Sequence, residues 1–138
     1  MLTWLNKYRD VGLLIVRVGL GVMYMIHGVP KMMGGPGKWA GLAAGVGLTV
    51  GGPFWGFMAA FSESVGGLLL AMGLLFRPAV GLIFCTMMEA LSFHLRRGDG
   101  FEVYSRPIEM MIMFAGLFLI GAGRYSVDEC KCACAGGG

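Results

Sequence analysis

Apolar residues fill four long stretches of this chain, at about 11–28, 54–76, 78–93 and 107–122. Each is close to the ~20 residues that a helix needs to cross a bilayer. Since backbone polar groups in lipid must be satisfied within the segment, helices rather than open strands are expected. The pattern predicts an all-α fold, a membrane four-helix bundle, with Pro78 and Pro107 in the first turns of the last two spans.

A Gly/Pro-rich segment, residues 30–53, separates the first two spans. Within it Trp39, Leu42, Ala43 and Val46 recur at helical spacing. They predict a short interfacial helix, with Trp39 at the level of the lipid headgroups. A re-entrant helix is the alternative.

An even number of spans places both termini, and the turn at Arg77, on one side of the membrane. The opposite side holds residues 30–53 and the turn at 96–106. Each side carries five Lys or Arg residues, so the positive-inside rule does not set the orientation. We expect cytoplasmic termini from the thiol-rich tail alone. The first span is expected to be retained, because Arg17 interrupts what would be the apolar core of a signal peptide.

Composition supports a membrane protein. The chain is 57% hydrophobic and only 14% charged, with a mean hydropathy of +0.73. We expect one membrane domain over residues 1–128 and a Cys/Gly-rich tail over 129–138. The net charge of +3 is scattered, so no nucleic-acid-binding stripe is present. The expected partners are membrane lipid and either another subunit or a second copy of the chain.

Arg17 stands in the middle of the first apolar stretch. A charge at that depth costs roughly 3 kcal/mol on insertion scales, so Arg17 is expected to face protein and to have a partner. The predicted partners are Glu63, Glu89 and Glu109. Such a pair either fixes the helix register or belongs to a functional site.

Further polar residues share the face of Arg17. Tyr24, His27 and Lys31 follow it at offsets of seven, ten and fourteen, and so lie on one helical stripe. Small residues flank Glu63, which is therefore expected to point inward. Helical depth places these groups around one cavity that opens beside the 30–53 loop and ends at Arg17. The predicted cavity residues are Arg17, Tyr24, His27, Lys31, Glu63, Glu89, His94 and Glu109.

The four cysteines are unevenly distributed. Cys85 lies in an apolar span and is expected to be a buried packing residue. Cys130, Cys132 and Cys134 alternate near the C-terminus, a pattern that is no disulfide framework. Three thiolates at this spacing are a candidate binding site for a soft metal such as Cu(I).

Motifs along most of the chain, about residues 13–128, resemble the DoxX family. The first span carries R-x-G-x-G-x5-H-G-x2-K from Arg17 to Lys31, and the second carries E-x2-G-G from Glu63, followed by Gly73 and Arg77. The fourth span ends in G-x-G-R-Y-S-x-D, from Gly121 to Asp128.

The resemblance implies a small four-helix integral protein, expected in a bacterial or archaeal plasma membrane. It also implies a link to sulfur and thiol redox chemistry, through a quinone-coupled thiosulfate oxidoreductase and assemblies that counter oxidative stress. Arg17 and Glu63 look like the recurring polar residues of the family. The cysteine tail departs from the family pattern, so no family role is assigned to it.

The leading hypothesis is a subunit of a quinone-linked redox system. His27, Lys31 and Arg17 would donate to the quinone oxygens, and the glutamates would relay protons. No flavin or nicotinamide motif is present, so electrons would come from a partner subunit and the chain would be at most part of an oxidoreductase. The alternatives are a soft-metal protein, haem ligation by His27 and His94, and a scaffold.

Overall fold

The structure, a computed structural model, describes residues 7–130. Its helices are α1 (Arg9–Met32), α2 (Gly35–Gly45), α3 (Gly52–Met72), α4 (Phe76–Arg97) and α5 (Phe101–Ile120). The described residues contain no strand. All helices except α2 are long and apolar enough to cross a membrane. The predicted all-α, four-span fold is confirmed.

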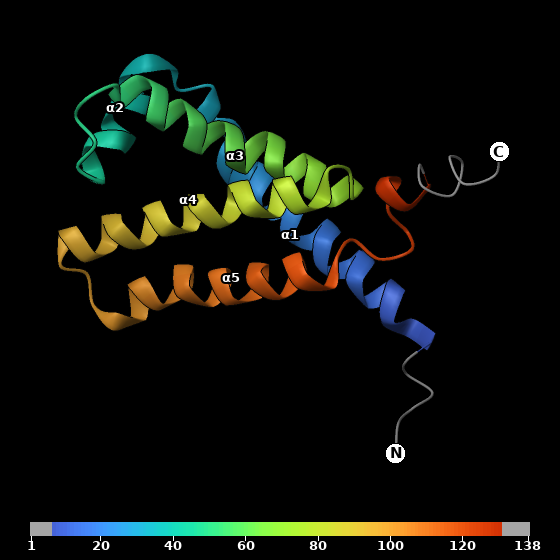
Figure 1. The fold of residues 1–138 in the computed structure, drawn as a ribbon. Helices are drawn as coiled ribbons and strands as arrows, with labels where there is room; N and C mark the ends of the chain where they lie inside the picture. The colour runs from blue at the N-terminus through green and yellow to red at the C-terminus, as the bar shows by residue number, and fades with distance from the viewer. Residues whose placement is uncertain (1–6, 131–138) are drawn as a thin grey trace.

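The spans form a bundle in which each span packs on the next span in the sequence (Figure 1). The helix α1 packs on α3, α3 on α4, and α4 on α5. The short helix α2 lies against α3, which confirms a helix between the first two spans. Gly56 of α3 permits this contact, because an added Cβ there would lie 1.9 Å from the carbonyl oxygen of Trp39.

Four predicted helix boundaries are wrong by four residues or more. The helices α1 and α4 end at Met32 and Arg97, each four residues later than expected. The helix α5 begins at Phe101, six residues earlier than expected, so Pro107 lies inside it rather than in its first turn. The additional residues include Glu102 and Arg106, whose charges hid the helix from a search for apolar runs. The helix α3 ends at Met72, because Gly73 adopts a left-handed conformation with φ of 66°.

Small residues bring α1 and α3 into close contact. A Cβ at Gly21 would lie 2.5 Å from the carbonyl oxygen of Gly67, and one at Gly28 would lie 2.4 Å from the backbone nitrogen of Ser64. No side chain fits at either position without moving the backbones apart. This is the packing expected where helices associate in lipid, and it agrees with the predicted inward face of Glu63.

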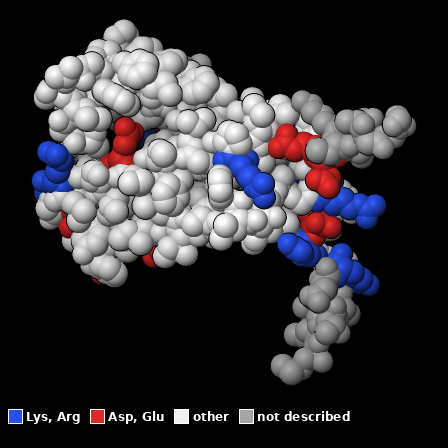
Figure 2. Space-filling model, viewed as in Figure 1, with Lys and Arg blue, Asp and Glu red and all other residues white. Residues whose placement is uncertain are grey.

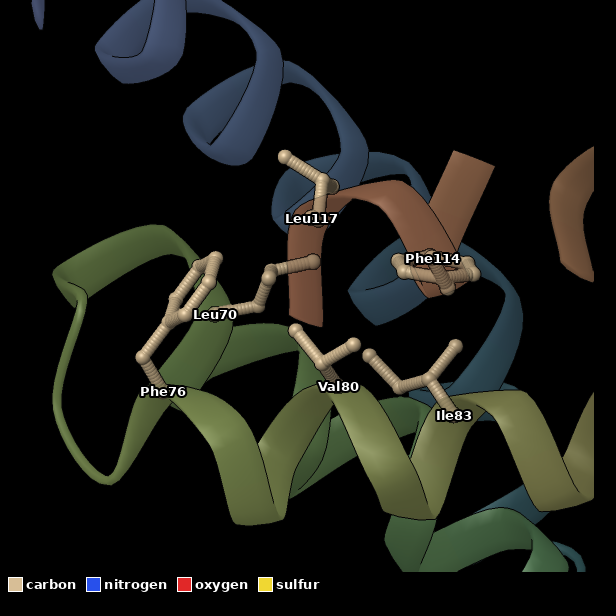
Figure 3. Close-up of a cluster of buried hydrophobic side chains, with 6 residues drawn as sticks. All are labelled: Leu70, Phe76, Val80, Ile83, Phe114 and Leu117. Atoms are coloured by element: carbon tan, nitrogen blue, oxygen red, sulfur yellow. The ribbon is translucent and has the colours of Figure 1, made fainter. Parts of the chain in front are cut away.

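The largest apolar cluster lies where α3, α4 and α5 meet (Figure 3). It consists of Leu70, Phe76, Val80, Ile83, Phe114 and Leu117. Tyr24 of α1 reaches this cluster, with its ring centroid 5.3 Å from that of Phe114. Through this ring contact, α1 packs against the cluster and so against α5.

Charged side chains gather toward the end where α1 begins, and the middle of the visible face is mostly uncharged (Figure 2). That end also holds the α3–α4 turn and the segment after α5 (Figure 1). The other end holds α2 and the α4–α5 turn. The two predicted groups of connecting segments therefore lie at opposite ends of the bundle.

Candidate functional site

A lysine and a glutamate form a close ion pair inside the bundle. The Nζ atom of Lys31 lies 2.7 Å from Oε1 and 2.6 Å from Oε2 of Glu63. The Glu63 side chain is only 5% exposed, whereas that of Lys31 is 32% exposed. The glycine at position 28 explains the pairing, because it brings α1 against the backbone of Glu63 one helical turn before Lys31.

Two pockets meet at this pair. The first, which we call the α2 pocket, has a volume of about 230 Å³ and is lined by Lys31, Glu63, Glu89, His94 and apolar residues of α2, α3 and α4. The second, the α5 pocket, has a volume of about 420 Å³ and includes Tyr24, His27 and Met110 beside the pair. In Figure 2, acidic atoms are visible inside a hollow of the face near α2, as the lining of the α2 pocket requires.

The α5 pocket contains several hydrogen-bond donors in an apolar wall. Lys31 uses two of its three N–H groups on Glu63, which leaves one free. His27 donates from Nδ1 to the carbonyl oxygen of Met23 at 2.8 Å, and its Nε2, then an acceptor, has no hydrogen bond with the described residues. The Tyr24 hydroxyl donates to the sulfur of Met87 at 3.1 Å, a weak acceptor. The pocket is therefore suited to an apolar ligand with carbonyl oxygens.

Glu89 and His94 lie in the α2 pocket. Glu89 is half-buried and has no hydrogen bond or ion pair with any residue in 7–130. It also borders a third pocket, of about 370 Å³, against Trp55 and Cys85. His94 is 2.7 Å from Asp99, between Nδ1 and a carboxylate oxygen, at the end of α4. The two residues thus connect the ion pair with the end of the bundle that holds the α4–α5 turn.

The predicted pairing of Arg17 with a glutamate is wrong. Arg17 is buried, with 2% exposure, and none of the ion pairs in the described part of the chain includes it. Its guanidinium donates instead to the carbonyl oxygens of Ala122, at 3.1 Å, and Tyr125. Arg17 therefore lies outside both pockets, and the cavity does not end at it.

Arg17 contacts a second cluster, which we call the C-terminal clasp and define as residues 121–128. The Asp128 carboxylate accepts hydrogen bonds from the backbone nitrogens of Leu75, at 3.0 Å, and Phe76, at 2.9 Å. Asp10 accepts from the backbone nitrogen of Arg124 at 3.3 Å. The clasp thus joins the start of α1 to the α3–α4 turn. The G-x-G-R-Y-S-x-D motif was the signal for it, but carbonyl acceptors leave no trace in a side-chain pattern.

Other predicted residues have different surroundings. Glu109 is exposed on α5 and lines neither pocket. Cys85 is exposed rather than buried, because it faces the third pocket, beside Trp55, and not the apolar cluster. His27 and His94 line different pockets, an arrangement that gives no support to shared haem ligation.

The predicted soft-metal site lies largely in the C-terminal tail. Cys130 is exposed, and Cys132 and Cys134 lie outside the described residues. Residues 7–130 contain no group of three His, Cys, Asp or Glu side chains placed to hold a metal ion.

Four apolar helices, packed through glycines around an internal ion pair, define a multi-pass membrane protein. The chain matches the DoxX family over residues 12–95 and belongs to that family. It is also 32% identical over 131 residues to an uncharacterized protein of Haemophilus influenzae, a match that covers 91% of this chain and 94% of the relative. No solved structure matches it. The family match includes Lys31, Glu63, Glu89 and His94.

Proposed function

We propose that this protein is the membrane subunit of a quinone-linked redox system that oxidises thiols or other sulfur compounds or counters oxidative stress. The quinone headgroup would bind in the α5 pocket. The observation that carries the proposal is the Lys31–Glu63 pair, which places a charged donor and a carboxylate at the wall of an apolar pocket. Membership of the DoxX family supports a redox role.

The residues of the α5 pocket fit a quinone. Its volume of about 420 Å³ lies within the usual range for small-molecule sites, roughly 300–1,000 Å³. Leu20, Met23 and Met110 provide apolar contacts, and methionine adapts well to a flat ring. The free N–H of Lys31 is a donor for a carbonyl oxygen, and Nε2 of His27 is an acceptor for the hydroxyl of the reduced form. A bound quinone supplies an acceptor for two electrons and two protons.

Each polar residue then has a defined task. Lys31 orients the ligand and stabilises negative charge on its oxygen, since interactions in a water-poor site are stronger than in water. Glu63 fixes the Lys31 ammonium, and its carboxylate can accept a proton and pass it to the ligand. The apolar wall excludes water. Electrons come from a partner subunit that oxidises a thiol or thiosulfate.

The remaining parts of the proposal concern the cell. We place the protein in the plasma membrane of a bacterium or archaeon, with the C-terminal clasp on the cytoplasmic side. A partner redox subunit or a second copy of the chain would contact the lipid-facing helices.

The test is quinone reduction by membranes that contain the wild type, Lys31→Gln or Glu63→Gln, with thiosulfate or a small thiol as donor. We expect both variants to lose about 100-fold in rate, the usual scale for positioned acid–base groups. Glu102→Gln is the matched control, because Glu102 is an exposed carboxylate at the start of α5. Protein amounts are compared in every sample. A wild type that neither binds a short-chain quinone nor reduces it would refute the proposal, as would full activity in both variants.

A further inference from the structure

The α2 pocket has no task in the quinone site described above. It shares Lys31 and Glu63 with the α5 pocket, but its other walls come from α2, α3 and α4. A ligand in the α5 pocket therefore contacts one side of the ion pair and leaves the α2 pocket free. This arrangement raises the question of what the α2 pocket contains.

The charges of the α2 pocket disfavour an anionic ligand. Its titratable side chains are Lys31, Glu63, Glu89 and His94. Lys31 is already neutralised by Glu63, which leaves the Glu89 carboxyl group without a counter-charge. A second negative charge in such a site would be repelled strongly, because a partly buried site screens charges poorly. Thiosulfate and thiolates are therefore poor occupants.

The same side chains lie one after another along the pocket. His94 and Asp99 lie at the end of α4, where Nδ1 of the imidazole is 2.7 Å from a carboxylate oxygen of Asp99. Glu89 precedes His94 by five residues, about 7.5 Å along the helix axis. Glu63 follows at the ion pair, where the two pockets meet. Proton-exchanging groups thus extend from the end of the bundle to the quinone site.

The pocket also has room for water between these groups. Its volume is about 230 Å³, whereas a water molecule occupies about 30 Å³ in the liquid. The hydroxyl of Thr86 lines it as well, and this group uses its hydrogen on the carbonyl oxygen of Leu82, so it offers an acceptor. Several bridging waters can therefore find the polar partners that they need.

We propose that the α2 pocket is the proton inlet of this protein, and that Glu89 passes protons from the His94 end to Glu63. The inference rests on the proposed quinone site. Each quinone reduced takes up two electrons from the partner, which oxidises two thiols to a disulfide, and two protons through the inlet. Glu89 releases a proton to Glu63 and regains one from water near His94. Glu63 delivers its proton to the ligand oxygen.

The test compares wild type, Glu89→Gln and Glu89→Asp in membranes, with Glu102→Gln as the control for loss of an exposed carboxylate. Binding of a short-chain quinone is measured separately on the purified protein. We expect Glu89→Gln to bind the quinone with an unchanged Kd but to form quinol about 100-fold more slowly. Glu89→Asp retains part of the rate. A small weak acid such as formic acid partly restores the rate of Glu89→Gln, which a purely structural defect would not permit.

The outcomes separate the inlet from the quinone site. A normal rate in Glu89→Gln would overturn the inlet and leave the quinone site intact. Loss of quinone binding in Glu89→Gln would place the ligand in the α2 pocket and also overturn the inlet. Absence of quinone binding in the wild type would refute the quinone site itself, and the inlet with it.

Discussion

Glu63 and Arg17 are charged residues of the apolar helices, and of the two only Glu63 forms an ion pair within residues 7–130. Glu63 binds Lys31 of the neighbouring helix, and Arg17 binds two backbone carbonyl oxygens. The two groups are held in different parts of the bundle, and Nε of Arg17 has no hydrogen-bond partner among the described residues. The site and the clasp are therefore separate, and single substitutions can affect one without the other.

Lys31→Met and Glu63→Gln each remove one member of the ion pair. Breaking a fully buried pair typically costs 3–5 kcal/mol, and we expect about 2 kcal/mol here because Lys31 is one-third exposed. The double variant should lose clearly less than the sum of the single losses, since neither charge is left alone. Unfolding by SDS in mixed micelles measures each value. Additive losses would show that the two side chains are not coupled.

Arg17→Lys keeps the charge but replaces the planar guanidinium, which reaches two carbonyl oxygens, with a single ammonium. We expect a loss of about 1–2 kcal/mol in the free energy of unfolding, the scale of one charged hydrogen bond. The Kd for a short-chain quinone should not change, because Arg17 lines neither pocket. Weakened quinone binding in the folded variant would show that Arg17 contributes to the quinone site.

The helices α1 and α3 form the interface on which the site depends. Gly21 and Gly28 allow the two backbones to touch, and this contact sets the height of Lys31 over Glu63. The clasp has a comparable role at the other end, where it holds the α3–α4 turn. Helix geometry, rather than the side chains of the pockets alone, thus fixes the site.

Gly28→Ala introduces a Cβ 2.4 Å from the backbone nitrogen of Ser64. We expect a loss of about 1–3 kcal/mol, as for an overpacked core, together with weaker quinone binding as the ion pair is displaced. Gly19→Ala is the matched control on the same helix, because nothing lies within 4 Å of its Cβ. Thermal unfolding in detergent compares the two variants. Equal melting temperatures would contradict close packing at Gly28.

Asp128→Asn preserves the shape of the side chain but leaves one oxygen in place of two. One of the bonds to the backbone nitrogens of Leu75 and Phe76 should be lost, with a cost of about 1 kcal/mol at the start of α4. Glu129→Gln is the control, since Glu129 is exposed. The same thermal unfolding experiment applies. A melting temperature equal to that of the control would mean that the hydrogen bonds of Asp128 contribute nothing to stability.

For the whole molecule, hydropathy was sufficient to predict the class, the number of spans and the short helix between the first two. Composition and helical length determine these properties, and lipid leaves few alternatives. The face of Glu63 also followed from its small neighbours. The partner of Arg17 could not be predicted, because every residue has the same backbone carbonyl group. The two separate pockets could not be predicted either, since helical spacing shows which side chains share a helix face but not which helices pack together.

The four-span topology predicts that Lys38, in α2, and Cys130 lie on opposite sides of the membrane. A Lys38→Cys variant with its other cysteines replaced by serine, and a variant that keeps only Cys130, can be labelled with an impermeant maleimide in sealed vesicles of known orientation. Each should react from one side only, and the sides should differ. Labelling of both from the same side would refute the odd number of spans, α3, α4 and α5, between them.

The hydrogen bond from the Arg17 guanidinium to the carbonyl oxygen of Ala122 joins residues that are 105 positions apart in the chain. At roughly 5–20 residues per second, a ribosome needs about 5–20 s to make the intervening segment. Throughout that interval the first helix carries a charge whose native acceptors do not yet exist. A chain that stops before residue 122 keeps this charge unsatisfied, so Arg17 distinguishes a finished protein from an unfinished one during its assembly in the membrane.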